Sequence, residues 1–292
     1  MGDIDTPKRG LLTTSDDVAG ILPGDYGKLV IEPVQQASIA MQVGQLIPTA
    51  SNTFHIPVIR EDATASWIAE GEDAEISDAK FEEIVVTPSK VVGFSVVSRE
   101  LAKDSSPAAT EAVGHSLARS IAKSVDAAFF GDEEEPAPSG LEAMEGATVI
   151  YAGATLTDLD WAVEGALNAA GKGTFVGAWV ANEDTAKAIA SLKEGNDSNR
   201  GLIEPDPKVA GRYQIQGAPL LVSSAIAENT VWGIPKTAAI VVLREDVQVD
   251  TDTSLFFQSD RVAVRALARV GFAFPVPSQV QKVLIEAAPV AP

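Results

Sequence analysis

The clearest pattern of apolar and polar positions in the chain lies between Pro107 and Phe130. Apolar residues recur there at every fourth position, and polar or charged residues recur at the same spacing on nearly the opposite face. The apolar set is Val113, Leu117, Ile121, Val125 and Phe129, and the other set is Glu111, His115, Arg119 and Lys123. This spacing is typical of one amphipathic helix. Ser106 can cap it, and Gly131 can end it, so the sequence predicts a helix about 36 Å long.

The segment before this helix, about 53–101, has strand-like runs but little that it could bury against itself. The runs are 53–59, 65–69, 81–87 and 91–97. Residues 60–83 hold nine carboxylates but only two cations, Arg60 and Lys80. A two-stranded ribbon is marginally stable alone in water, and its open edges invite pairing with another chain. We therefore expect this ribbon to lie on a neighbouring subunit.

Trp67 lies in the acidic part of this segment, with little apolar company nearby in the sequence. Burial of an aromatic side chain of this size contributes roughly 2 to 3 kcal/mol, and a lone ribbon cannot supply it. Partial burial of Trp67 against its own hairpin is the simpler interpretation. A pocket on a neighbouring subunit would better explain a large aromatic side chain in this acidic segment.

The chain after the helix predicts a second compact region. An acidic, proline-containing stretch at 132–140 reads as a linker. Helices are expected at 156–170, capped by Thr157, and from Asn182 or Asp184 to Leu192, with Asn182 as a good cap. A buried strand is expected at 175–180, and a long loop at 194–212.

Strand-like runs dominate the rest of the chain. They are 219–223, 238–243, 247–250, 255–258, 262–270 and 279–286, and the run at 262–270 alternates with period two. Helices and strands are segregated along the chain more than they alternate. This favours an α+β fold over a doubly wound sheet.

Composition and charge narrow the classes of function. The 292 residues are 46% hydrophobic, contain no cysteine and carry a net charge of −19. Disulfides, thiol catalysis and thiolate metal sites are therefore excluded. Strong direct binding to nucleic-acid phosphates is disfavoured, since that affinity comes from Lys and Arg. The charge fits either solubility or a shell wall that does not stick to packed nucleic acid. No run approaches the roughly 18 apolar residues of a membrane helix, and 1–10 does not resemble a secretory signal.

Catalytic, cofactor and metal motifs are not apparent in the sequence. The two histidines, His55 and His115, have no metal-ligand partner four residues away. The run 171–174 lacks the spacing of a phosphate-binding loop, and 133–135 reads as solvated linker rather than a cation site. A Ser–His–Asp triad needs no adjacent residues, so it stays an open alternative, but no nucleophile-elbow motif supports it. We expect no enzyme activity, cofactor or metal.

Several short motifs follow one another in a constant order between about residues 30 and 285. They are 56–58, 65–71 and 87–90 in the ribbon, 97–101 and 104–106 before the long helix, 131–141 after it, 179–182, 192–193 and 217–220 in the compact region, and 261–265 with 269–273 near the end. In this order they resemble the major capsid proteins of tailed bacteriophages, which have the Hong-Kong-97-type fold. No motif is specific by itself, and the resemblance depends on their joint order.

The resemblance implies four parts and a function. The parts are an N-terminal arm at 1–50, an extended β-hairpin loop at 51–92, a peripheral domain with a long spine helix at 93–140 and 251–292, and an axial domain at 141–250. The function is that of a major capsid protein, assembled in the host cytoplasm into the icosahedral shell of the virion. Its partners would be copies of itself in hexamers and pentamers, enclosed double-stranded DNA without sequence-specific binding, and separate scaffolding, portal and decoration proteins. The alternative is an encapsulin-like nanocompartment shell that encloses a cargo enzyme.

The resemblance also directs attention to contacts between subunits. We expect them at Trp67, Glu70, Glu72 and Lys80 of the extended loop, and at Arg119 and Lys123 of an adjacent spine helix. Some members of the family join subunits by a Lys–Asn isopeptide bond. Lys80 or Lys90 could supply the amine, but 258–260 reads Gln-Ser-Asp and offers no asparagine, so we expect no cross-link. Some members begin with a long scaffolding segment, whereas only a short arm precedes the loop here, so scaffolding is expected to be a separate protein or absent.

Overall fold

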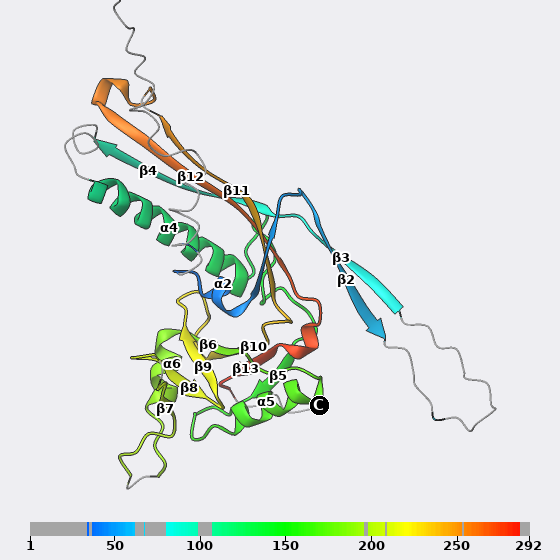
Figure 1. The fold of residues 1–292 in the computed structure, drawn as a ribbon. Helices are drawn as coiled ribbons and strands as arrows, with labels where there is room; N and C mark the ends of the chain where they lie inside the picture. Colours follow the sequence, from blue (N-terminus) through cyan, green and yellow to red (C-terminus); the bar gives the residue numbers. More distant parts are fainter. Residues whose placement is uncertain are drawn as a thin grey trace, which may run out of the picture.

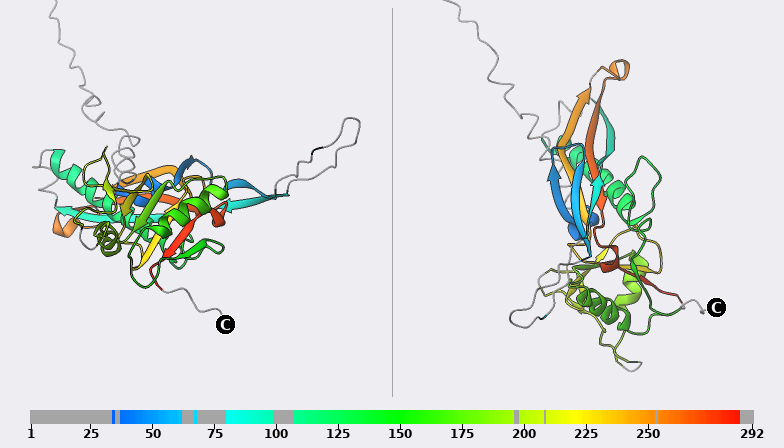
Figure 2. Two further views of the ribbon diagram at one scale, coloured as in Figure 1. Left: turned by 90° about the horizontal axis from the view of Figure 1, so that it is seen from below. Right: turned by 90° about the vertical axis from the view of Figure 1, so that its right-hand side faces the viewer.

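The chain forms three parts that are distinct in space (Figure 1). A computed structural model describes residues 34, 37–61, 67, 80–98, 107–195, 198–207, 209–252 and 254–286. One part is a four-stranded sheet with a long helix along one face. The second is a seven-stranded sheet with two helices, and the third is a two-stranded ribbon that projects away from both (Figures 1 and 2).

The long helix, α4, spans Pro107–Phe130, so its predicted bounds are confirmed at both ends. Leu117, Ile121, Val125 and Phe129 of the predicted apolar stripe are buried. They pack on a sheet whose strand order is β1-β11-β12-β4. These strands are β1 (Gln45–Thr49), β11 (Ile240–Asp252), β12 (Arg261–Ala273) and β4 (Ser89–Ser98). The face that carries α4 is called the inner face below.

Gly93 of β4 allows the helix to approach the sheet closely. A Cβ atom at this position would lie 3.2 Å from Cδ2 of Leu117 and 3.4 Å from Cγ1 of Ile121. A larger side chain would therefore push α4 away from the strand.

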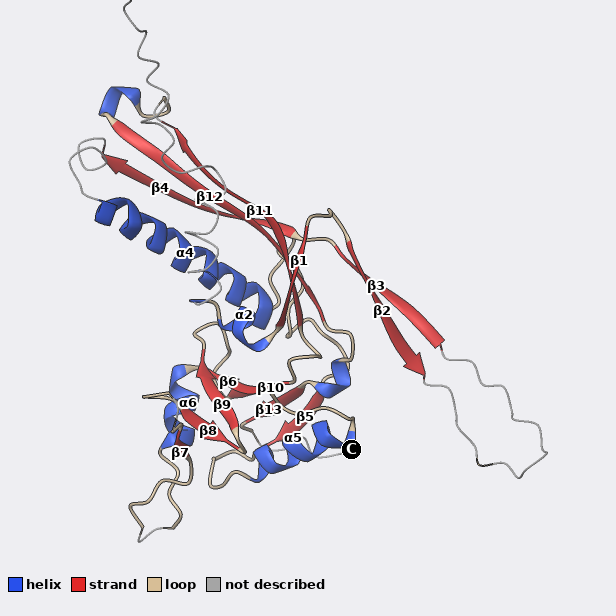
Figure 3. Ribbon diagram, in the orientation of Figure 1, coloured by secondary structure: helices blue, strands red, loops and turns tan. Residues whose placement is uncertain are grey.

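The seven-stranded sheet lies beyond the carboxyl end of α4 (Figure 3). Its strands, in spatial order, are β5 (Thr148–Tyr151), β13 (Gln281–Leu284), β10 (Thr230–Ile234), β6 (Ala178–Ala181), β9 (Ala218–Val222), β8 (Tyr213–Ile215) and β7 (Glu204–Pro205). One face packs on α5 (Asp160–Gly171) and α6 (Glu183–Ala190). The other face joins the same apolar cluster as α4. The α+β class is confirmed.

Trp179 of β6 is the centre of the core under α5 and α6. Its ring meets that of Trp161 edge to face, with centroids 5.3 Å apart. A Cβ atom on Gly233 of β10 would lie 2.5 Å from Cζ3 of Trp179. The glycine therefore leaves the space that the indole fills, and the two strands together specify this core.

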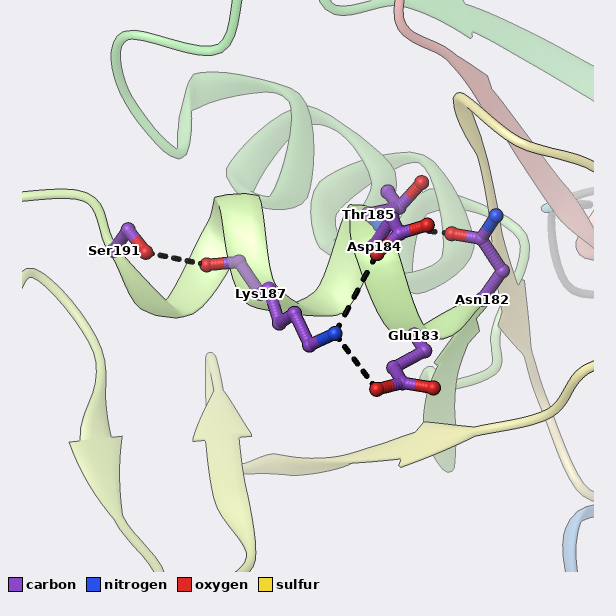
Figure 4. A network of polar contacts seen from close by, with 6 residues as sticks. All are labelled: Asn182, Glu183, Asp184, Thr185, Lys187 and Ser191. Atoms are coloured by element: carbon purple, nitrogen blue, oxygen red, sulfur yellow. Dashed lines mark hydrogen bonds and ion pairs between the residues drawn. The ribbon is translucent and has the colours of Figure 1, made fainter.

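The helix α6 begins as the sequence predicts. Asn182 is its N-cap, and Oδ1 of Asn182 accepts a hydrogen bond from the Thr185 N–H at 2.8 Å (Figure 4). Nζ of Lys187 lies 2.7 Å from Glu183 and 3.5 Å from Asp184. The hydrogen bond that Lys187 donates to the Glu183 carboxylate, and then the charge of that carboxylate, raise the pKa of Lys187 above 10.5.

Several predicted elements differ from the structure. The helix expected at 156–170 begins only at Asp160, and Thr157 does not cap it, because its hydroxyl donates to Asp158 instead. The run at 255–258, expected as a strand, leads into a short 3₁₀ turn at Phe257–Ser259. The runs at 238–243 and 247–250 form the single strand β11, with irregular pairing between Arg244 and Gln248.

The expected part boundaries fall inside strands. The division at 92/93 lies within β4, and that at 250/251 lies within β11. The C-terminal strand β13 pairs with β10 and β5 in the seven-stranded sheet, not in the sheet that carries α4. The segment expected as 251–292 of the peripheral domain therefore contributes a strand to each of the two sheets, β12 to one and β13 to the other.

The ribbon consists of β2 (Phe54–Glu61) and β3 (Lys80–Val86), which pair antiparallel as expected for 53–59 and 81–87. The run at 91–97, by contrast, forms β4 and pairs with β12 along its whole length. The expectation that 53–101 finds nothing to fold against within its own chain is thus wrong for β4. Of the run at 65–69, only Trp67 lies within the described residues.

A buried carboxylate joins the start of the described chain to α4. Asp126 Oδ1 accepts hydrogen bonds from the Ser38 hydroxyl at 2.6 Å and from the Ala40 N–H at 2.9 Å. Its Oδ2 accepts from the Ile39 N–H at 3.1 Å. These donors belong to the cap and first turn of the short helix α2 (Ile39–Val43). One side chain thus satisfies three donors at a helix start, where backbone N–H groups otherwise lack partners.

Burial raises the pKa of Asp126 above 3.8, against the hydrogen bonds from Ser38, Ala40 and Ile39, which lower it. Above pH 3.8 and up to the higher folded pKa, the folded protein therefore binds more protons here than the unfolded chain does. The contribution of this titration to the free energy of unfolding is fully present below pH 3.8. It is lost as the pH rises through the folded pKa.

We predict that Asp126→Ala lowers the free energy of unfolding of the subunit by about 2 to 4 kcal/mol at neutral pH, because buried donors lose their acceptor. The variant should also lose the pH-dependent contribution described above. Denaturant unfolding of the isolated subunit as a function of pH measures both effects. Asp132→Ala, at an exposed carboxylate just beyond the helix, is the control and should change stability by less than about 0.5 kcal/mol. Equal losses in the two variants would contradict the assigned role of Asp126.

Candidate functional site

No constellation typical of a catalytic or metal centre occurs in the part of the chain that the structure describes. That part holds no group of three or more His, Asp or Glu residues able to bind a metal ion. His55 Nδ1 lies 2.8 Å from Glu83 Oε1 on the exposed ribbon, and His115 lies on the exposed face of α4. No described helix is both long and apolar enough to cross a membrane.

A pocket of about 360 Å³ lies between β4, the end of α4, β12 and the stretch that follows α4. Its lining is mainly apolar, and includes Val91, Val125 and Phe272. Lys90, Glu133 and Glu134 are its charged residues. Its hydroxyl groups belong to Ser89 and Ser124, and no histidine lines it.

The ribbon has two unlike faces. Phe54, Ile56 and Ile84 pack at its base against Val86 and the end of the four-stranded sheet. On the other face, Ile59 and Phe81 are paired in register and are 52% and 72% exposed. Apolar side chains at this exposure are typical of a surface that another molecule covers.

The expected contact residues lie on two separate elements. Trp67 is fully exposed, and Lys80 begins β3 opposite Glu61. Glu70 and Glu72 lie outside the described residues. Arg119 and Lys123 are exposed on the side of α4 that faces away from the sheet. Within one subunit the ribbon and α4 diverge (Figure 1). A contact between these two groups therefore needs two subunits.

The outer face of the four-stranded sheet, opposite α4, carries a pattern that sequence reasoning missed. Arg244 of β11 pairs in register with Arg269 of β12, which pairs with Lys90 of β4. We call these three residues the cation row. Directly paired residues in antiparallel strands point to the same face, so three cations stand side by side across three strands. Their sequence positions give no hint of this, because only strand register brings them together.

Apolar side chains continue the outer face beyond the cation row. Val92, Phe94 and Val96 of β4 alternate with inward-facing residues and are all exposed, Phe94 at 53%. Phe94 stands opposite Arg265, whose guanidinium binds Asp250 at 2.6 Å. Hydrogen bonds from the Ser254 hydroxyl and N–H lower the pKa of the neighbouring Asp252. This face therefore offers both cationic and apolar contacts at the edge strand.

Comparisons with known proteins agree with this architecture. The sequence profile of the Phage capsid family matches residues 20–283. The major capsid protein of Klebsiella oxytoca phage phiKO2 is 23% identical over 288 residues, which cover 88% of this chain but only 64% of that protein. The chain thus spans slightly less than two thirds of the length of this relative.

Solved structures share the fold at low sequence identity. The capsid of a native GTA particle superposes with a TM-score of 0.66 at 18% identity, covering 86% of this chain and 90% of that one. A chain from Mycobacterium phage Adephagia gives a TM-score of 0.67 at 15% identity, covering 87% and 91%. The resemblance found in the sequence motifs is confirmed. Because the family profile covers most of its length, the chain belongs to the phage capsid family.

Proposed function

We propose that the chain is a major capsid protein that assembles, as hexamers and pentamers of itself, into an icosahedral shell around double-stranded phage DNA. The observation that carries the proposal is the projecting ribbon, which exposes Ile59 and Phe81 in a chain of the phage capsid family. In a shell of many copies, every ribbon can pack on the surface of a neighbouring subunit. In a monomer, Ile59 and Phe81 of the ribbon stay exposed to solvent.

Physical reasoning supports an assembly role for the ribbon. Two strands without a third strand or helix are marginally stable in water. Among the described residues, Phe54, Ile56 and Ile84 at the base of the ribbon pack on the end of the four-stranded sheet, whereas Ile59 and Phe81 farther out are exposed. A second molecule that covers Ile59 and Phe81 would make ribbon order and assembly interdependent.

The parts of the chain receive roles by analogy with the family. We assign 1–50 as the arm, 51–92 as the extended loop, 93–140 with 251–292 as the peripheral domain, and 141–250 as the axial domain, although β13 pairs in the seven-stranded sheet. Trp67, Glu70, Glu72 and Lys80 are proposed contacts of the extended loop. Arg119 and Lys123 are proposed contacts of the spine helix α4.

The net charge of −19 suits a container for DNA that makes no sequence-specific contacts. A negative wall repels phosphate, so enclosed DNA stays free to be packed and released. In this proposal the protein resides in the virion capsid after assembly in the host cytoplasm. Scaffolding, portal and decoration proteins are proposed as separate partners.

Electron microscopy of the purified chain over a range of salt and pH tests this function. We expect closed shells of uniform size, and nuclease-protected double-stranded DNA inside native particles. A chain that stays monomeric under all these conditions would overturn the proposal. Closed native particles that hold a cargo enzyme instead of DNA would replace it with the nanocompartment alternative.

We predict that Trp67→Ala weakens shells without weakening subunits. The side chain is fully exposed in the subunit, so its loss should leave the free energy of unfolding unchanged within about 0.5 kcal/mol. A buried aromatic anchor at an interface is worth about 2 kcal/mol or more, so thermal disassembly of shells should occur at lower temperature. Denaturant unfolding of subunits and calorimetry of shells measure the two quantities. Trp67→Phe should restore most of the shell stability, and shells of Trp67→Ala as stable as the wild type would refute the anchor.

A further inference from the structure

The helix α5 is apolar on both of its sides. The side toward the sheet is buried, through Trp161, Ala162 and Ala169. The side away from the sheet carries Val163 and Leu167, which lie one turn apart and are 40% and 67% exposed. We call these two residues the outer line of α5. A helix that is apolar all round is typical of a buried position, so the outer line is a surface that another molecule covers.

The charges of α5 restrict what can cover it. Asp160 and Glu164 are the only charged residues of the helix, and both are exposed. Contact between the α5 helices of two copies would place these carboxylates close to each other, and like charges disfavour an interface. The surface that covers the outer line therefore has to combine apolar or aromatic groups with a cation.

The opposite end of the same sheet offers such a surface. A Cβ atom on Gly165 would lie 3.3 Å from Cδ1 of Ile150 and 3.7 Å from Cγ of Gln281, so α5 covers the end of the sheet formed by β5 and β13. The strands β7 and β8 form the other end (Figure 3). Tyr213 of β8 is 39% exposed there, and Arg212 precedes it in the chain. Tyr and Arg are among the residues that contribute most to protein interfaces.

Arg212 and Tyr213 are held in a fixed arrangement. Nε and Nη2 of Arg212 donate to Oδ2 of Asp206 at 2.7 and 2.5 Å, and the Asp206 N–H donates to the Arg212 carbonyl at 2.7 Å. Tyr213 pairs with Pro205 of β7 on one side and with Leu220 of β9 on the other. The Arg212 side chain is 33% exposed and keeps further N–H donors, which can bind a second carboxylate. This end of the sheet is therefore preorganised to meet an apolar and acidic surface.

We propose that the outer line of α5 packs on Tyr213 of the next copy of this chain, with Glu164 facing Arg212 of that copy. The two surfaces are different parts of the subunit, so the contact is heterologous, and its repetition around an axis closes a ring. The proposal rests on the proposed shell function, which requires rings of five and six copies. It adds the two ends of the seven-stranded sheet as the surfaces that join neighbouring copies in each ring.

Site-directed cross-linking of the full chain tests the contact, because the chain contains no cysteine. The double variant Leu167→Cys with Tyr213→Cys is assembled and treated with a short bismaleimide. Each subunit of a ring then joins the next, so denaturing electrophoresis should show covalent oligomers of up to five and six subunits. Each single variant should stay monomeric, because its cysteine faces no second cysteine.

The matched control, Asp132→Cys with Tyr213→Cys, has an exposed cysteine just beyond α4 and should give no covalent oligomers. A double variant Leu167→Cys with Tyr213→Cys that forms shells but stays monomeric on the gel would overturn the proposal and leave the proposed function standing. Covalent dimers of Leu167→Cys alone would do the same, because they would show that α5 meets α5. Oligomers of the control equal to those of the tested pair would also overturn it. A wild-type chain that forms no shells would overturn both the contact and the function.

Labelling of Leu167→Cys with a monofunctional maleimide tests whether a second copy covers α5. This variant keeps Tyr213, so it covers the case in which the double variant does not assemble, and circular dichroism establishes its folding. The labelling rate should fall about tenfold on assembly, because the reactivity of a thiol depends on its exposure. Slow labelling already in isolated subunits would show that the subunit's own chain covers the outer line, and a rate unchanged by assembly would show that nothing does. Either result would overturn the proposal.

Discussion

The packing of α4 on the inner face of the four-stranded sheet is the contact on which the rest of the molecule depends. Its apolar stripe shares one continuous cluster with residues of both sheets, including Val180 and Trp232 of the seven-stranded sheet. Phe129, near the end of the helix, meets Phe272 and Phe274 at centroid distances of 5.1 and 5.7 Å. The helix therefore fixes the position of the second sheet as well as that of the first.

The same helix holds the segment that leads into β1, through Asp126 and the first turn of α2. The strands that it supports also anchor the ribbon, whose base packs at the end of the outer face. Stability thus decreases outward from α4. The apolar stripe of α4 is buried in a cluster that includes residues of both sheets, whereas the outer part of the ribbon consists of two strands only. This gradient suits a protein whose outermost part finds its partner on another subunit.

Patterns among residues that are close in the sequence predict the helix α4 and the start of the helix α6. The four-residue spacing from Val113 to Phe129 predicts α4 at both ends, and the cap Asn182 predicts the start of α6. The strand β10 escapes notice because every one of its residues is buried, which removes the alternation of polar and apolar positions. The irregular pairing after Arg244 makes β11 read as two strands.

The remaining features depend on contacts between residues that are far apart in the sequence. The run at 91–97 looks like part of the ribbon until its pairing with β12 is known. The exposure of Trp67 agrees with the expectation that its own hairpin does not bury it, but its partner stays a prediction. The cation row depends on the register of three strands, of which β4 is far from β11 and β12 in the sequence, so no local pattern could reveal it.

Hydrogen exchange of the ribbon, compared between isolated subunits and assembled shells, tests the central claim most directly. The account predicts that amides of β2 and β3 exchange fast in subunits and become protected in shells, whereas amides of α4 are protected in both states. Ribbon amides equally protected in subunits and shells would show that the ribbon is stable without a neighbour, and would contradict the account.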